Sequence, residues 1–150
     1  MRDAVLRQIY RLGYWVLYLT AFLTRPHARG VKGVISNGGE VLFVRHTYGP
    51  HEWELPGGGQ RRHETPLEAL ARELHEELGV TVAGATSLGT FSGPRQYRNV
   101  VVNYFSVELP SREVSADPIE IAEVRWFDPS APPSPIGWYA KEALARSATR

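Results

Sequence analysis

The segment from Thr65 to Gly79 constrains the fold more than any other, because it contains both ends of one helix. Thr65-Pro66-Leu67-Glu68 is a capping box with proline at the first helical position, and Leu78-Gly79 is typical of a helix that ends in a left-handed residue. The sequence therefore predicts a helix between these ends. Its buried face is expected to be an apolar stripe at helical spacing, formed by Leu67, Leu70, Ala71, Leu74 and Leu78.

The opposite face of this helix is acidic. Glu73, Glu76 and Glu77 fall within about one helical turn and are expected to point away from the apolar stripe. Like charges at this spacing repel by roughly 0.2–0.5 kcal/mol per pair. A hard divalent cation reverses the sign of this effect, since Mg²⁺ prefers carboxylate oxygens and bound phosphates. The cluster indicates a metal site, with a solvated acidic surface as the alternative.

The loop before the helix favours the metal site. It contains Gly57, Gly58 and Gly59 in succession, which is costly in backbone entropy and suits a backbone that lets a ligand approach closely. A glycine carbonyl could complete the metal shell, and free amides could meet phosphate oxygens. Taken alone, a glycine run indicates a flexible turn. Joined to the acidic helix in fixed register, it predicts a site for phosphate chemistry.

Residues 58–80 resemble the Nudix box, Gly-x5-Glu-x7-Arg-Glu-U-x-Glu-Glu-x-Gly-U, in which U is a bulky aliphatic residue. Every defined position is filled, by Gly58, Glu64, Arg72, Glu73, Leu74, Glu76, Glu77, Gly79 and Val80. The chain is therefore similar to Nudix hydrolases. The resemblance implies an α/β protein, a Nudix-type α/β/α sandwich with a mixed β-sheet, to which an extra N-terminal helix is added.

The resemblance also implies an activity: metal-dependent hydrolysis of the pyrophosphate bond in a nucleoside diphosphate linked to another moiety. The substrate classes are NTPs or dNTPs, ADP-ribose-like compounds and dinucleoside polyphosphates. The expected cofactor is Mg²⁺, with Mn²⁺ as a substitute. Two alternatives stay open, a catalytically inactive nucleotide-sensing module and an RNA 5′-end pyrophosphohydrolase.

The resemblance assigns a role to each polar residue of the box. Glu73, Glu76 and Glu77 occupy the metal-ligand positions, and the Gly57 carbonyl is a further ligand. Arg72 is expected to orient a ligand glutamate. Catalytic roles are expected for Glu76, Glu77, Arg72, Glu64 (which assists binding or orients the helix ligands) and Glu120.

The identity of the general base stays open between a box glutamate and a glutamate of a late loop. Glu120 lies in such a loop, and Glu123 is the other candidate for the general base. For each of these two residues, an exposed loop carboxylate is the alternative interpretation.

Residues that could contact the substrate are less well defined. Arg45, Arg61, Arg95 and Arg98 could bind phosphates. Tyr97 and Pro94 resemble markers of two different substrate classes, dinucleoside polyphosphates and ADP-ribose respectively. Aromatic residues that could stack on a base or pack in the core are Tyr48, Trp53 and Tyr104. Four histidines form no coherent set of metal ligands: His46, His51, His63 and His75.

Composition narrows the function further. The chain has 150 residues, of which 43% are hydrophobic, so that one domain with a real core is expected. The absence of cysteine excludes thiolate chemistry and counts against the isomerase branch of the family, which uses a cysteine. The net charge of +1 gives no reason to expect DNA binding. The expected partner is a small-molecule nucleotide, and the expected location is the cytoplasm.

The expected elements alternate along the chain. An Asn37-Gly38-Gly39 turn predicts a hairpin. Strands are expected at 30–36, 40–45, within 80–92, at 99–109 and at 124–127, and helices at 3–23 and 137–148. We expect residues 1–25 to be an apolar helical extension and residues 26–150 to be the Nudix hydrolase domain.

Residues 12–23 are apolar nearly all round, and arginines flank them at positions 2, 7, 11 and 25. A spanning helix needs roughly 20 apolar residues, so this segment is short. Three interpretations stay open. The helix packs on its own domain or in a homodimer interface, it contacts a membrane surface peripherally, or it is a signal or spanning segment.

Overall fold

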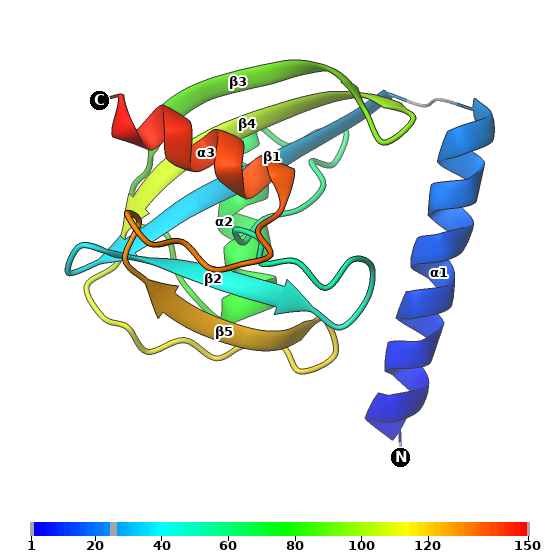
Figure 1. Cartoon of the computed structure of the whole chain (residues 1–150), viewed down its shortest axis with the longest axis horizontal. Helices are drawn as coiled ribbons and strands as arrows, with labels where there is room; N and C mark the ends of the chain where they lie inside the picture. Colours follow the sequence, from blue (N-terminus) through cyan, green and yellow to red (C-terminus); the bar gives the residue numbers. More distant parts are fainter. Residues whose placement is uncertain (1, 25–26, 150) are drawn as a thin grey trace.

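The computed structural model describes residues 2–24 and 27–149. Its elements are, in chain order, α1 (Arg2–Thr24), β1 (His27–Asn37), β2 (Glu40–His46), α2 (Pro66–Leu78), β3 (Thr86–Arg95), β4 (Arg98–Glu108), β5 (Ile121–Phe127) and α3 (Trp138–Ala148) (Figure 1).

The strands form one five-stranded sheet in the order β3-β4-β1-β2-β5. β1 and β4 run parallel, whereas the other neighbours are antiparallel, so the sheet is mixed. α2 covers one face of the sheet and α3 the other, and α1 stands beside this sandwich (Figure 1). The predicted α/β/α sandwich with an extra N-terminal helix is confirmed.

Each face of the sheet has its own core. Leu70, Leu74 and Leu78 of α2 pack with Val31 and Ile35 of β1 on one face. Ala140 and Ala143 of α3 pack on the other face, whose buried aromatic residues include Phe43, Trp53 and Tyr104. Trp53 and Tyr104 are only 5% and 0% exposed, so these two are core residues and cannot stack on a base.

Both predicted ends of α2 are confirmed. The Thr65 side chain accepts a hydrogen bond from the Glu68 amide, and the Glu68 carboxylate accepts one from the Thr65 amide. Gly79 adopts a left-handed conformation, with φ of 65°. The predicted buried face is partly wrong: Leu67 is exposed, while Glu77 is 3% exposed. The helix is rotated from the expected position, because the loop that contains Gly57, Gly58 and Gly59 (the glycine loop) covers the side of the helix on which Glu77 lies.

Several strands are longer than predicted, since pairing with neighbours extends them. β1 begins at His27 because it pairs with β4 from there to Ser36. β5 begins at Ile121, where it pairs with His46. Within the β-rich segment 80–92, only the part from Thr86 onward is a strand.

β1 and β2 pair only beside the Gly38-Gly39 turn, at Ser36–Val41 and Asn37–Glu40. Farther from the turn, residues 54–60 occupy the space between them. Glu54 pairs with Val44 of β2, and the Gly58 carbonyl accepts a hydrogen bond from the Val31 amide of β1 at 2.9 Å. The glycine loop is therefore held like an irregular strand inside the sheet.

α1 contacts the rest of the chain along one side only. Arg7 donates two hydrogen bonds to the Pro118 carbonyl, at 3.0 and 2.8 Å. The rings of Tyr14 and Tyr48 lie 5.9 Å apart. Within the described ranges, no helix is long and apolar enough to cross a membrane.

Candidate active site

The glycine loop adopts a backbone path that only glycine allows at its centre. Gly57 has φ of 124°, and a Cβ at this position would overlap the Val31 carbonyl oxygen. A Cβ at Gly58 would lie 2.6 Å from Glu73 Oε2. The two glycines therefore bring the backbone against β1 on one side. On the other side the backbone lies against the acidic turn of α2, which carries Glu73, Glu76 and Glu77.

Glu77 joins the helix to this loop. Its Oε2 accepts a hydrogen bond of 2.9 Å from the Gly57 amide, and the residue is 3% exposed. Burial raises the pKa of Glu77 to about 7, against the lowering effects of Lys32 and of the Gly57 amide. Its carboxylate is thus buried without full compensation for its charge.

Arg72 connects the polar residues of the box. Its guanidinium donates to Glu64 at 2.6 and 2.9 Å, to Glu73 at 2.7 Å and to Glu76 at 3.0 Å. It also donates to the Gly59 carbonyl at 2.8 Å. The hydrogen bonds from Arg72 are the main reason that the pKa of Glu64 falls to about 2. Arg72 therefore holds two of the three clustered glutamates and the loop in one arrangement.

Lys32, which no sequence motif marks, also contacts the glycine loop. Its Nζ donates to the Leu55 carbonyl at 2.9 Å and to the Gly57 carbonyl at 3.1 Å. It thus supplies a positive charge at the oxygen predicted to be a metal ligand. A lysine in the otherwise apolar run from Val31 to Ile35 was the available indication, since a charge inside a strand needs a partner.

The donor set fits a hard divalent cation. Glu73, Glu76, Glu77 and the Gly57 carbonyl all offer oxygen atoms, the ligands that Mg²⁺ and Mn²⁺ favour. Within residues 2–24 and 27–149, no three acidic or histidine side chains already converge on one point. Arg72 and Lys32 hold these oxygens instead. A cation would relieve the cost of the buried Glu77 charge, so the chemistry of the site matches a metal.

The two candidate bases lie in different surroundings. Glu120 is half-buried, and its pKa is raised by burial and by the nearby carboxylates of Asp117, Glu73 and Glu76. The nearby Tyr10 hydroxyl acts in the opposite direction and lowers this pKa. Glu123 instead pairs with Arg45 at 3.1 Å and with Arg125. The structure thus places Glu120 near the acidic turn.

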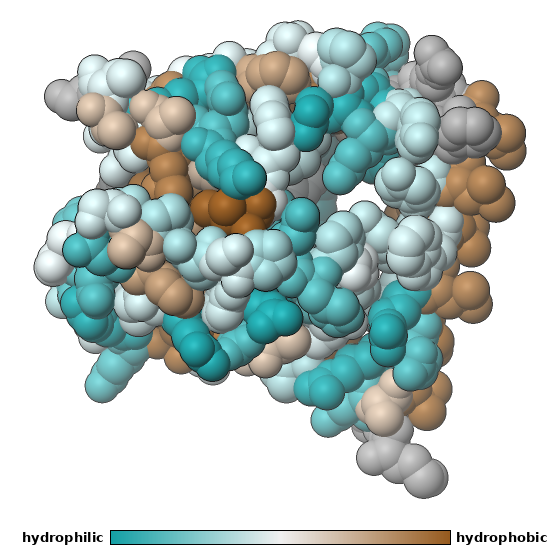
Figure 2. All heavy atoms as spheres, viewed as in Figure 1, coloured by the Kyte–Doolittle hydropathy of each residue, from teal (hydrophilic) through white to brown (hydrophobic). Residues whose placement is uncertain are grey.

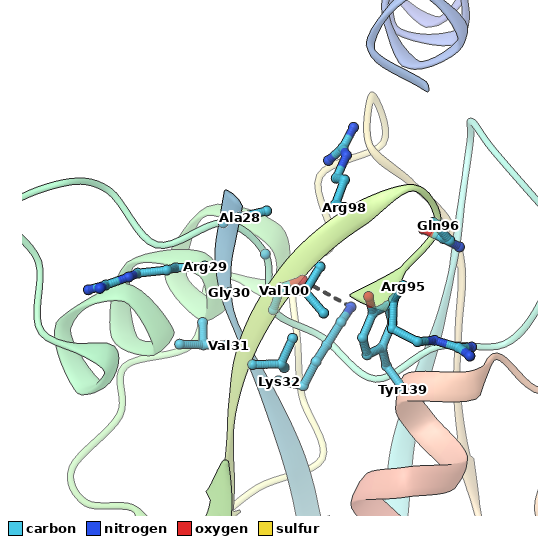
Figure 3. A pocket seen from close by; sticks show the side chains of 14 residues that line it. Ala28, Arg29, Gly30, Val31, Lys32, Arg95, Gln96, Arg98, Val100 and Tyr139 are labelled. Atoms are coloured by element: carbon cyan, nitrogen blue, oxygen red, sulfur yellow. Dashed lines mark hydrogen bonds between the residues drawn. The ribbon is translucent and has the colours of Figure 1, made fainter. Parts of the chain in front are cut away.

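A cavity of about 260 Å³ opens on the α3 side of the glycine loop (Figure 3). Its walls include all three glycines of the loop together with Lys32, Arg95, Arg98 and Tyr139. Lys32 of β1 and Tyr139 of α3 both line it, while Arg98 rises from β4 at its rim (Figure 3). The loop therefore separates a basic cavity from the acidic turn of α2.

The four arginines predicted to bind phosphates divide into two groups. Arg95 and Arg98 line the cavity, and the Arg95 guanidinium stacks 3.9 Å from the Trp138 ring centre. Arg45 is paired with Glu123, and Arg61 with Glu76 at 3.3 Å.

The weaker sequence indications fall outside the cavity or at its edge. Pro94 pairs with Asn99 at the end of the β3–β4 hairpin. Tyr97 lies in the tight turn of that hairpin, with φ of 63°, and its ring is 5.8 Å from that of Tyr18. Tyr48 is half-buried between α1 and His46, at 5.2 Å from the His46 ring. The four histidines form no metal cluster among the residues described.

Part of the chain is similar in sequence to curated proteins. The chain is 40% identical over 65 residues to an RNA pyrophosphohydrolase of Tolumonas auensis. The aligned region covers 43% of this chain and 37% of that protein. It is 34% identical over 97 residues to an RNA pyrophosphohydrolase of Aeromonas hydrophila. This alignment covers 63% of this chain and 49% of that protein. The chain thus spans at most about half the length of these curated relatives.

Solved structures share the fold. A MutT NUDIX hydrolase from Burkholderia pseudomallei is 25% identical and superposes with a TM-score of 0.74, covering 80% of this chain and 97% of that one. A MutT protein from Methanosarcina mazei is 24% identical, with a TM-score of 0.72 over 84% of this chain and 96% of that one. The sequence model of the NUDIX domain matches residues 26–146. The predicted family is therefore confirmed: the chain belongs to the Nudix family, whose members generally depend on a divalent metal.

Proposed function

We propose that the chain is a pyrophosphohydrolase that cleaves the pyrophosphate bond of a nucleoside diphosphate linked to another moiety, with Mg²⁺ as cofactor and Mn²⁺ as a substitute. One observation carries the proposal: residues 57–59 form a wall between the basic cavity and the acidic turn of α2. A nucleotide in the cavity would have its phosphates beside the loop amides and within reach of the carboxylates. Cleavage of a phosphoanhydride needs these two kinds of surroundings side by side.

The residues of the site have distinct proposed roles. Glu73, Glu76, Glu77 and the Gly57 carbonyl hold the metal, which when bound polarises phosphoryl oxygens and lowers the pKa of a bound water. Arg72 positions the carboxylates of Glu73 and Glu76, and Glu64 fixes Arg72 from its other side. Lys32 orients the Gly57 carbonyl through its hydrogen bond.

We propose Glu120 as the general base. Its raised pKa favours proton uptake more than that of an ordinary carboxylate, which suits a group that accepts a proton during the reaction. Its position near Glu73 and Glu76 supports this role, whereas Glu123 is neutralised by two arginines.

The proposed catalytic unit is residues 26–150, with residues 1–25 as an extension. All the groups named above lie in this unit. We propose that the protein acts in the cytoplasm, and no DNA binding is expected from a net charge of +1.

A second candidate is the removal of pyrophosphate from an RNA 5′ end. It is favoured by the names of the two curated relatives described above. Arg29, Arg95 and Arg98 around the cavity provide charge for phosphates beyond the first nucleotide. Triphosphorylated RNA and free nucleotides would then compete for the same cavity.

The test is a substrate panel with Mg²⁺, comprising NTPs, ADP-ribose, dinucleoside polyphosphates and RNA with a 5′ triphosphate. Mass spectrometry of the products in ¹⁸O-labelled water identifies the phosphorus that is attacked. We expect turnover of at least one class and its loss in Glu76→Gln, while Glu113→Gln, in an exposed loop, retains it. Binding without turnover of any compound would favour the sensing module instead.

A further inference from the structure

The outer side of α1 carries a regular apolar seam. Alternate spacings of four and three residues join its six members, which together follow a heptad repeat: Val5, Ile9, Leu12, Val16, Leu19 and Leu23. All six are 52–72% exposed within the chain. Figure 2 shows hydrophobic side chains along the outer edge of the molecule, where α1 lies. A seam with this repeat is what two helices need to pack along their length.

The seam points directly away from the chain's own domain. At about 100° per residue, Arg7 and Tyr14 lie on the opposite side of α1. Both residues help to hold the helix on its domain: Arg7 donates to the Pro118 carbonyl, and Tyr14 packs near Gly49 and Tyr48. The helix is therefore oriented by one face, and the heptad face has no partner among the described residues.

We propose that this seam pairs with the same seam of a second copy of the chain, as a two-stranded parallel helix pair. In the middle of the seam, Ile9 and Val16 occupy the first apolar position of the heptad, and Leu12 and Leu19 the second. β-Branched residues at the first and leucine at the second favour parallel dimers. The same surface patch on both copies also gives a closed, two-fold interface.

The available area is enough for such an interface. Six seam residues, together with Trp15 (58% exposed) beside them, offer on the order of 500 Å² of apolar surface per chain at the usual area of an aliphatic or aromatic side chain. Two copies would bury about 1,000 Å², the size at which specific interfaces begin. The domains lie on the far sides of the two helices, so that they would not collide.

Gly13 provides a second, independent observation. A glycine inside a helix destabilises it by roughly 0.5–1 kcal/mol relative to alanine. Among the described residues, nothing other than the neighbouring backbone of α1 itself lies within 4 Å of a Cβ placed there, so the packing of α1 on its own domain does not require a glycine. Gly13 lies immediately beside the seam, where the absence of a side chain would let a second helix approach closely.

The distribution of charged residues on α1 favours a second copy of the chain over an anionic membrane as the partner of the seam. A helix that binds an anionic lipid surface carries its lysines and arginines along the border of the apolar face. In the described part of α1, Arg7 and Arg11 lie on the opposite side, and Arg7 is held by Pro118. Within residues 3–20 of α1, the flanks of the seam carry uncharged residues instead, including Gln8, Gly13 and Thr20.

The test is the mass of the full chain in sedimentation velocity over a wide range of concentration. The wild type is expected to be a dimer, and the double variant Leu12→Glu/Leu19→Glu a monomer with an unchanged circular dichroism spectrum. Leu17→Glu is the matched control, because Leu17 is exposed to the same degree (63%) but lies off the seam. A monomeric wild type, or equal effects of seam and control variants, would overturn the proposal.

Cross-linking tests the parallel register. The chain has no cysteine, so single-cysteine variants are clean probes. Leu12→Cys is expected to form an interchain disulfide under mild oxidation, whereas Leu17→Cys is not. A dimer without the Leu12→Cys cross-link would exclude the parallel arrangement. A wild-type monomer that co-sediments with phosphatidylserine vesicles would assign the seam to a membrane surface instead.

Discussion

The carboxylate of Glu77 and the backbone amide of Gly57 are joined by a buried hydrogen bond of 2.9 Å. This contact makes the acidic turn of α2 and the glycine loop one structural unit. Because a single amide compensates only part of the charge, burial still raises the pKa of Glu77 to about 7. The site is therefore built at some cost to the stability of the metal-free chain.

Replacement of Glu77 by glutamine should expose this cost. The pKa of Glu77 is higher in the folded state, at about 7, than in the unfolded state, at 4.5. The contribution of Glu77 to the free energy of unfolding is therefore fully present below pH 4.5 and is lost as the pH rises through 7. Glu77→Gln is thus expected to raise the free energy of unfolding of the metal-free protein by about 1–3 kcal/mol at pH 8, with little effect at pH 5. Chemical denaturation in EDTA measures this difference.

Glu76→Gln is the control for that measurement. The Glu76 side chain is 49% exposed, so its charge is already solvated, and a change within about 0.5 kcal/mol is expected. Both variants should lose the rise in melting temperature that Mg²⁺ produces in the wild type. Equal stability of Glu77→Gln and wild type at pH 8 would contradict the buried charge.

Substitutions in the glycine loop should separate two neighbouring positions. Gly58→Ala places a methyl group 2.6 Å from Glu73 Oε2, so that the carboxylate must move. We expect metal affinity to fall by about 10-fold or more, as seen when the support of a metal ligand is removed. Gly59→Ala has open space at the same atom and should bind Mg²⁺ normally. Isothermal titration with Mg²⁺ or Mn²⁺ compares the two.

Arg72 is expected to be irreplaceable by lysine. A lysine keeps the charge but cannot donate at once to Glu64, Glu73 and Glu76, as the guanidinium does. Arg72→Lys should therefore lower kcat by about 10–100-fold while the fold stays intact. If the charge alone mattered, kcat of Arg72→Lys would match that of the wild type.

The two candidate bases can be distinguished by a pair of variants. Glu120→Gln is expected to lower kcat by about 100-fold or more and to remove the acidic limb of the pH–rate profile, since the profile reports the pKa of the base. Glu123→Gln breaks an ion pair with Arg45 at the surface and should keep both kcat and the acidic limb. The reverse pattern would assign the role to Glu123.

His46 should make the fold sensitive to acid. Burial lowers its pKa from 6.5 to about 4, and Lys32 acts in the same direction. Because the pKa of His46 is lower in the folded state, the contribution of its neutral form to stability is present above pH 6.5 and is lost as the pH falls through 4. The loss is at most about 3 kcal/mol of the free energy of unfolding. His46→Phe, which keeps the ring beside Tyr48, should unfold less readily at pH 4.5 than the wild type. Denaturant titrations at pH 4.5 and 7.5 provide the comparison.

Local features were predictable from the sequence because they depend on residues a few positions apart. The capping box at Thr65, the left-handed Gly79 and the Gly38-Gly39 turn each involve hydrogen bonds or backbone angles within one turn of chain. The order of strands and helices followed from such ends and from hydrophobic patterns. The strand bounds were less accurate, since pairing with a distant strand such as β4 extends β1 beyond its own pattern.

By itself, the sequence determined the α2 helix with its ends, the three clustered glutamates and the family. Only the tertiary structure decided that Glu77 is buried against Gly57, that Lys32 bonds to the same glycine, and that Glu120 lies near the acidic turn. These placements join residues that are 20 or more positions apart in the chain. Burial and electrostatic fields depend on the distance in space, which no local pattern encodes.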